Sequence, residues 1–195
     1  PDSDQEIFNE NDLVKSFQFQ QVQKKSAVFD EKKLLWISQQ HLSEMNVRDL
    51  MNEIYALSPG WGDGLEWDYL KEVVKLIKDR CKTIKEVATM SELFFKDKID
   101  YDPDLLSKTF NNESIAIIKD FHTALNTVED WSRVELENIF ENIMEQHEVV
   151  IGKVMKPIRV ALSGIPFGPG IFDLILLLGK DVCLRRLRHT LSEIE

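Results

Sequence analysis

Residues 68–88 read DYLKEVVKLIKDRCKTIKEVA, and their apolar side chains recur every three or four positions. This spacing gathers the apolar side chains on one face, because an α-helix completes a turn in about 3.6 residues. The positions that form this stripe are Leu70, Val73, Val74, Ile77, Cys81 and Ile84. The stretch therefore predicts one amphipathic helix or a pair of them.

The same helical period continues on both sides of this stretch. It is found in residues 29–41, 47–57, 114–128 and 131–150, whereas the alternation typical of a strand occurs only in short pieces such as 17–22. The chain is 43% hydrophobic, so it can bury a core and is not expected to be disordered. The sequence therefore predicts an all-α fold.

Clusters of Gly, Pro and Asp separate the helical stretches at residues 58–64, 100–103 and 164–170. A length of 195 residues fits one domain or two small ones. We place the boundary at the middle cluster, which predicts two helical subdomains, residues 1–100 and 101–195.

Charge is distributed unevenly along the chain. There are 24 Lys and Arg against 34 Asp and Glu, a formal net charge of −10, which argues against holding nucleic acid by charge alone. Residues 1–151 carry 17 basic and 30 acidic side chains, but residues 152–190 carry 7 basic and 2 acidic ones. Residues 152–190 are therefore net basic, whereas the rest of the chain is net acidic. The negative net charge of the whole chain does not exclude nucleic-acid contacts in the basic segment.

Several classes of protein are excluded by composition. Two cysteines, Cys81 and Cys183, without any Cys-x-x-Cys or His-x-x-x-His pair, argue against a disulfide scaffold or a zinc site and favour a reducing compartment. The longest apolar run, residues 174–178, is far shorter than the roughly 20 residues that span a bilayer. Residues 97–108 lack the Gly and Glu of a calcium-binding loop. None of the four His has a Ser or Cys at a spacing that would indicate a catalytic triad. No catalytic residue and no metal ligand is predicted.

A loop rich in Gly and Pro precedes an apolar helix, because residues 164–172 read GIPFGPGIF. Pro169 and Gly170 are expected to open that helix, whose first N–H groups have no partner within it and could bind base oxygens or phosphates. A sharp turn into a core helix explains the same residues. The basic cluster from Lys180 to His189 likewise suits a helix C-terminus, where the helix dipole favours cations. Both interpretations of this segment stay open.

Several motifs follow one another along nearly the whole chain: DQEIF (4–8), AVFDEKKLLW (27–36), RCKTIKE (80–86), RVALSG (159–164), GPGIF (168–172) and LLLGK (176–180). In this order they resemble the part of bacterial glutamyl-tRNA synthetases that follows the catalytic domain. The resemblance implies the family's α-helix cage of two subdomains, which binds the anticodon of tRNA(Glu).

The family is a class I ligase that joins glutamate to tRNA with ATP and magnesium in a separate catalytic domain. The signatures of that domain, His-x-Gly-His and Lys-Met-Ser-Lys, are absent here, and the chain begins at Pro1 rather than Met. We therefore expect a fragment that is inactive alone and holds no cofactor, from an enzyme that uses ATP and magnesium. The resemblance implies a cytoplasmic monomer whose partners are tRNA(Glu) and its own catalytic domain, without contact to a membrane.

Arg80 matches a family arginine that reads the first anticodon base and distinguishes cytosine from uracil. A planar guanidinium suits this role, because it is a rigid donor for the acceptors on a base edge. The residues alone also allow a solvated helix arginine that pairs with Asp79 or Glu86.

Further positions are implied by the same resemblance. Arg159 matches an arginine that contacts the anticodon, and the loop that packs on the later bases corresponds to Gly168, Pro169, Gly170 and Ile171. The position of Gly168 is often Thr in relatives, so a side-chain hydrogen bond is lost and discrimination against tRNA(Gln) stays open. Charge alone suggests phosphate contacts for Lys153 and Lys156.

Two other interpretations accompany these. An acidic helical domain that binds a basic protein is the alternative function. Helical spacing predicts core positions for Trp36 and Trp131, whereas Trp61, in a Gly-rich loop, is the tryptophan that we consider for base stacking.

Overall fold

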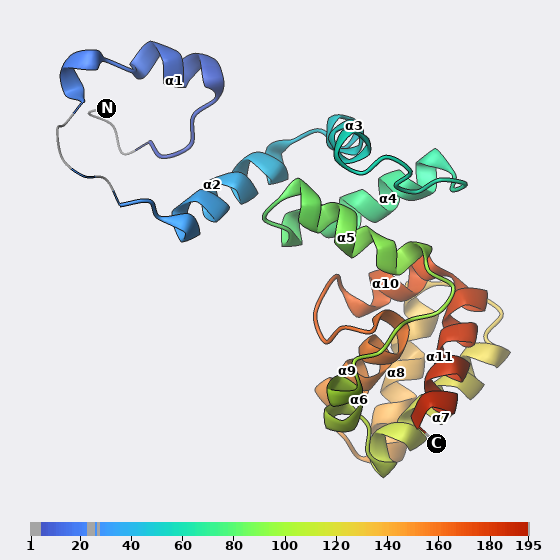
Figure 1. The fold of residues 1–195 in the computed structure, drawn as a ribbon. Coiled ribbons are helices and arrows are strands. Elements are labelled where there is room, and N and C mark those ends of the chain that lie inside the picture. Colours follow the sequence, from blue (N-terminus) through green and yellow to red (C-terminus); the bar gives the residue numbers. More distant parts are fainter. Residues whose placement is uncertain (1–4, 23–25, 27, 195) are drawn as a thin grey trace.

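A computed structural model describes residues 5–22, 26 and 28–194, and every regular element within these ranges is helical (Figure 1). Two 3-10 turns are η1 (Phe19–Gln21) and η2 (Lys78–Arg80). The α-helices are α1 (Glu10–Ser16), α2 (Glu31–Glu44), α3 (Val47–Leu57), α4 (Trp67–Ile77), α5 (Ile84–Phe95), α6 (Pro103–Thr109), α7 (Asn112–Thr127), α8 (Arg133–His147), α9 (Ile151–Ser163), α10 (Ile171–Leu178) and α11 (Lys180–Ile194). The all-α prediction is confirmed.

The stretch 68–88 forms a pair of helices, α4 and α5, rather than one. The turn η2 separates them, and Thr83 then caps α5 by accepting a hydrogen bond from the backbone N–H of Glu86 at 3.1 Å. The cap fixes where α5 begins, because it satisfies one of the N–H groups that lack a partner in the first turn. The predicted stretch 47–57 coincides with α3, whereas α9 was not predicted from the sequence.

The helices form two groups joined by the linker of residues 96–102. Helices α3, α4 and α5 pack on one another, and α7, α8, α9 and α11 pack together with α6 and α10 beside them (Figure 1). Helix α10 also contacts α4, and buried side chains of both groups belong to one connected core. The division into subdomains 1–100 and 101–195 stays a prediction.

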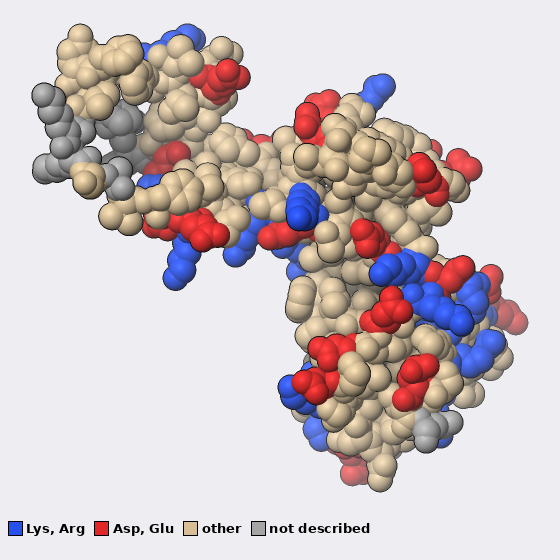
Figure 2. Space-filling model, in the orientation of Figure 1, with Lys and Arg blue, Asp and Glu red and all other residues tan. Residues whose placement is uncertain are grey.

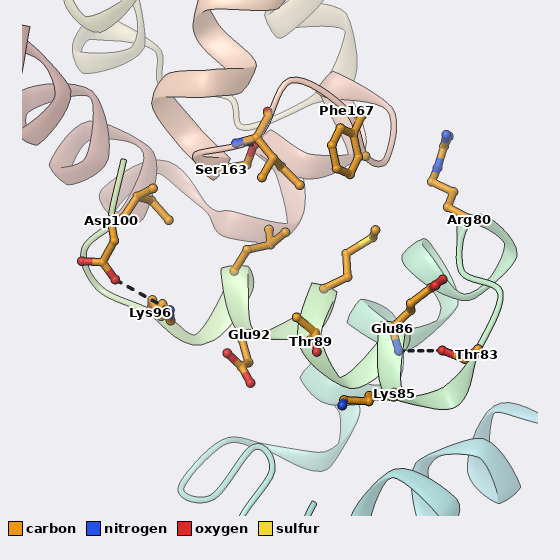
Figure 3. Close-up of a pocket in the computed structure, with 15 residues that line it drawn as sticks. Arg80, Thr83, Lys85, Glu86, Thr89, Glu92, Lys96, Asp100, Ser163 and Phe167 are labelled. Atoms are coloured by element: carbon orange, nitrogen blue, oxygen red, sulfur yellow. Dashed lines mark hydrogen bonds and ion pairs between the residues drawn. The ribbon is translucent and has the colours of Figure 1, made fainter. Parts of the chain in front are cut away.

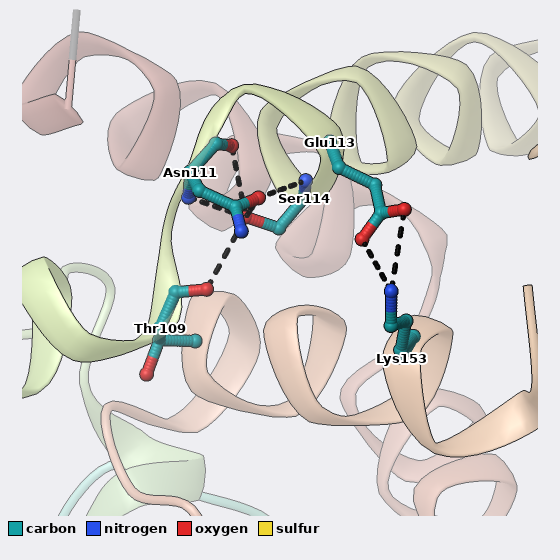
Figure 4. A network of polar contacts seen from close by, with 5 residues as sticks. All are labelled: Thr109, Asn111, Glu113, Ser114 and Lys153. Carbon is teal, nitrogen blue, oxygen red and sulfur yellow. Dashed lines mark hydrogen bonds and ion pairs between the residues drawn. The ribbon is translucent and has the colours of Figure 1, made fainter.

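Polar side chains fix the start of α7 in the second group. The Asn111 side chain accepts from the backbone N–H of Ser114 at 2.9 Å, and the Ser114 hydroxyl accepts from that of Asn111 at 2.7 Å (Figure 4). This reciprocal arrangement is a capping box, which satisfies two N–H groups at once. Glu113, next to it, reaches Lys153 of α9 at 3.0 Å. The two helices are therefore joined at this end.

The tryptophans occupy different environments from those predicted, apart from Trp131, which packs against the core. Trp36 is 40% exposed, so the predicted core position is wrong, because helix α2 buries Leu42 and no other of its side chains. Trp61 is buried, and its Nε1 donates to the Ser91 hydroxyl at 2.6 Å. The suggestion that Trp61 stacks on a base is therefore wrong as well. None of the described helices is long and apolar enough to span a membrane.

Candidate functional site

A pocket of about 870 Å³ lies between α5, the linker 96–102 and the loop of residues 164–170 (Figure 3). We call it the α5 pocket. Its lining comes from segments far apart in the sequence and comprises Arg80, Thr83, Lys85, Glu86, Thr89, Met90, Glu92, Leu93, Lys96, Ile99, Asp100, Ser163, Ile165, Phe167 and Gly168. Two positions that the resemblance implied from separate motifs, Arg80 and Gly168, thus share one cavity.

Arg80 is the last residue of η2, and its side chain is exposed beside the pocket. It makes no hydrogen bond or ion pair with any residue that the structure describes. The two acids proposed as its partners are engaged elsewhere: Asp79 lies 4.0 Å from the Lys78 ammonium, and Glu86 accepts from the backbone N–H of Lys82 at 2.7 Å. The guanidinium of Arg80 therefore has its donors available to a ligand.

Arg159 lies on α9, beneath the loop. Its Nη1 donates to the carbonyl of Pro169 at 2.5 Å, so one donor is used to hold the loop in place. Burial lowers the pKa of Arg159, and the positive charge of Arg80 lowers it further. The two predicted arginines are therefore within electrostatic reach of each other, and a ligand with acceptor atoms near both would relieve their repulsion.

The loop between α9 and α10 has a fixed conformation. Gly164 ends α9 with φ +71°, and a Cβ there would lie 2.5 Å from Cγ2 of Ile99 in the linker. Gly168 has φ +133°, a backbone conformation that residues other than glycine rarely adopt. A threonine at position 168 would therefore be strained in this loop. The Ser163 hydroxyl adds bonds within the turn, 2.8 Å from the Arg159 carbonyl and 3.1 Å from that of Ile165.

The start of α10 agrees with the predicted end of the loop. Gly170 is its N-cap, Pro169 is buried, and the Ile171 side chain is 3% exposed in the core, so only the backbone of Ile171 could meet a ligand. A Cβ on Gly170 would lie 2.5 Å from Oδ2 of Asp173, whose carboxylate also pairs with Arg133 at 2.9 Å. A phosphate fits poorly beside this carboxylate because both are negative.

Lys153 and Lys156 do not line the α5 pocket. Lys153 pairs with Glu113 at 3.0 Å (Figure 4), and Lys156 is exposed. Lys153 precedes Arg159 by six positions on α9, about 9 Å along the axis at 1.5 Å per residue. The structure therefore brings Arg80, Arg159 and the loop together and leaves Lys153 apart from them, whereas Lys156 lies outside the pocket but only three positions from Arg159 on α9.

Much of the remaining basic segment has structural partners. The expectation that the cluster from Lys180 to His189 lies at a helix C-terminus is wrong, because Lys180 begins α11 and the last turn of that helix holds no basic residue. Arg186 is fully buried, Lys180 donates to the carbonyls of Asn126 and Val128, and Arg185 lies 3.4 Å from Asp97. On the face seen in Figure 2, basic and acidic side chains are interspersed. Of the pocket residues, Phe167 was missed by sequence reasoning. It is 63% exposed, and the available signal was an aromatic side chain between Pro166 and Gly168 in a loop.

Known proteins resemble this chain over nearly its whole length. Residues 20–191 match the family described as anticodon binding domain. The glutamate–tRNA ligase of Thermodesulfovibrio yellowstonii is 29% identical over 194 residues, covering 97% of this chain and 42% of the relative. Glutamate–tRNA ligase 1 of Alkalilimnicola ehrlichii is 31% identical over 193 residues, covering 98% of this chain and 41% of the relative.

The fold is also found in a solved structure. The crystal structure of a glutamate tRNA ligase from Elizabethkingia meningosepticum, in complex with its amino acid, matches 95% of this chain and 37% of that chain with a TM-score of 0.77 and 22% identity. The present chain therefore spans about two fifths of the length of the curated relatives that it matches.

Proposed function

The chain belongs to the anticodon binding domain family, and from that membership we propose that it binds the anticodon loop of tRNA(Glu) as part of a glutamate–tRNA ligase. The observation that carries the proposal is the α5 pocket, which gathers Arg80 and the 164–170 loop in one cavity although they are far apart in the sequence. The alternative, an acidic domain that binds a basic protein, is not favoured because the family match covers residues 20–191.

In this proposal Arg80 reads the first anticodon base. Cytosine presents two adjacent acceptors, N3 and O2, on its pairing edge, whereas uracil places an N–H donor between its two carbonyls. Two parallel N–H donors of a guanidinium match the cytosine edge and meet the uracil donor unfavourably. Bases in a single-stranded loop expose these edges to side chains. That Arg80 has no partner among the described residues supports this role.

Arg159 and the loop complete the proposed site. Arg159 holds the Pro169 carbonyl and keeps its other N–H groups for the later anticodon bases, and the backbone from Gly168 to Ile171 packs against those bases. Lys153 and Lys156 are assigned to nearby phosphates on charge alone. Glutamylation itself, with ATP and magnesium, is assigned to a catalytic domain whose signatures this chain lacks. The complete enzyme is expected to be a cytoplasmic monomer.

The test is the affinity of the 195-residue chain for anticodon stem-loops of tRNA(Glu) with cytosine or uracil at the first anticodon position. Arg80→Gln should weaken binding of the cytosine stem-loop by about 1–3 kcal/mol more than binding of the uracil one, because a two-point base contact is lost. Arg48→Gln, an exposed arginine of α3 outside the pocket, is the matched control and should leave both affinities unchanged.

Two results would contradict the proposal. If the wild-type chain does not bind either stem-loop even at low salt, it is not an anticodon-binding module on its own. If Arg80→Gln weakens both stem-loops equally, Arg80 contacts a phosphate or supports the fold and does not read a base.

A further inference from the structure

We infer that Phe167 is a stacking platform for the anticodon base whose edge Arg80 reads, so that the α5 pocket holds one unstacked base by its face and by its edge. This inference rests on the proposed function and adds to it a residue that acts on every base alike. Arg80 would select the base, and Phe167 would hold it.

The exposure of Phe167 is the first observation. The side chain is 63% exposed, and from residue 68 to residue 194 no other Phe, Tyr or Trp is classed as exposed. Figure 3 shows the Phe167 ring on the loop side of the pocket and Arg80 on the other side. An aromatic ring placed beside a pocket and left open to solvent offers its face to a planar ligand, and stacking of a base on such a ring tolerates any base.

The loop fixes the backbone on both sides of Phe167 before any ligand arrives. Gly168, with φ +133°, turns the chain directly after Phe167. Arg159 then donates a hydrogen bond to the carbonyl of Pro169, the residue that follows. Pro166 precedes the ring and restricts the backbone on that side. A loop backbone fixed in this way loses little conformational entropy on binding, which favours affinity.

The charge of the pocket favours a base over a phosphate. Its lining includes three cationic side chains, Arg80, Lys85 and Lys96, and three acidic ones, Glu86, Glu92 and Asp100. Lys96 and Asp100 lie 3.8 Å apart and compensate each other. A phosphate would gain little net attraction among these balanced charges, whereas binding of a neutral heterocycle does not depend on a net positive charge.

The remaining lining suits the same ligand. Met90, Leu93, Ile99 and Ile165 provide apolar surface, and Thr83, Thr89 and Ser163 add hydroxyl groups. The volume of about 870 Å³ lies in the range of roughly 300–1,000 Å³ typical of small-ligand sites. The pocket therefore offers a nucleobase both apolar surface for its faces and hydrogen-bonding groups for its edges.

The experiment uses an anticodon stem-loop with the fluorescent cytosine analogue pyrrolocytosine at the first anticodon position, titrated with the 195-residue chain. The bound probe should be dimmer with wild-type protein than with Phe167→Leu, because stacking on the ring quenches it. Phe167→Leu should weaken binding by about 5- to 150-fold, the effect of losing one base–aromatic stack. Phe167→Trp should retain both the quenching and the affinity.

Controls separate this inference from the proposed function. Phe19→Leu, at a phenylalanine that is 83% exposed and outside the pocket, should change nothing. Phe167→Leu should weaken cytosine and uracil stem-loops equally, in contrast to Arg80→Gln. If wild-type protein binds but Phe167→Leu leaves affinity and fluorescence unchanged, the stacking role is overturned while anticodon binding stands. Absence of wild-type binding would overturn both.

Discussion

Replacing Arg186 by methionine would remove three hydrogen bonds that join α11 to two other parts of the fold. Nη1 of Arg186 donates to the carbonyl of Leu162 at 2.7 Å, and Nη2 donates to those of Leu93 at 2.7 Å and Lys96 at 2.5 Å. The side chain is fully buried, so no water can take over these bonds. Methionine keeps much of the aliphatic packing and leaves the three carbonyls without their donor.

The expected loss follows from these contacts. Hydrogen bonds from a charged donor contribute about 1.5–3 kcal/mol each, or about 5–9 kcal/mol for three. Burial of the guanidinium, which lowers the pKa of Arg186, costs several kcal/mol, and its Nε finds no partner among the described residues. The free energy of unfolding should therefore fall by about 3 kcal/mol, near the lower limit for removing one partner of a buried charged contact.

Urea unfolding followed by circular dichroism measures this change. With a slope of about 1–3 kcal/mol per molar urea, the midpoint should fall by about 1–3 M. Arg185→Met is the matched control, because the neighbouring cation is exposed and lies 3.4 Å from an Asp97 side chain that is 88% exposed. Such surface pairs contribute about 0–1 kcal/mol. Equal midpoints for Arg186→Met and Arg185→Met would refute the assignment of Arg186 as a structural cation.

Two further predictions concern buried titratable groups. Burial raises the pKa of the Cys81 thiol to about 11 and that of Cys183 to about 12, so neither should react with iodoacetamide at about pH 8 until urea unfolds the chain, as mass spectrometry would show. Fast labelling of folded protein would contradict their burial. Burial lowers the pKa of His122 from its ordinary value of 6.5, helped by the charge of Arg188, so the unfolded chain binds the proton more readily. The stability that His122 contributes is therefore present above about pH 6.5 and lost as the pH falls below it, and His122→Leu should flatten this part of the urea-midpoint profile. An unchanged slope would show that other groups cause the loss.

Local patterns predicted much of the fold. The apolar stripe of residues 47–57 coincides with α3, and the Pro169-Gly170 pair marks the start of α10, because period, cap and turn chemistry are all encoded within a few residues. Trp36 shows the limit of this reasoning. Its spacing is that of a core residue, but whether a helix face is covered depends on helices elsewhere in the chain.

The site was predictable in part. Arg80 and Gly168 were identified from separate motifs, but their meeting in one pocket depends on how the linker 96–102 and the end of α9 pack, which no local pattern contains. From the sequence, Arg186 is expected to be an ordinary cation near a helix C-terminus, but it lies in the middle of α11. The three carbonyls that accept its hydrogen bonds belong to distant segments, so only the packed structure identifies Arg186 as buried.

The position of Arg186 also has a consequence for the order in which the protein acquires its activity during synthesis. The lining of the α5 pocket comes from residues 80–100 and 163–168. The side chain that donates hydrogen bonds to segments on both sides of it is Arg186 of α11, the last helix of the described chain. A ribosome synthesises the residues that line the pocket before it synthesises Arg186, and contacts between distant segments form late in folding. The proposed anticodon binding should therefore be gained only when α11 has emerged and docked, because Arg186 then joins the segments that form the pocket.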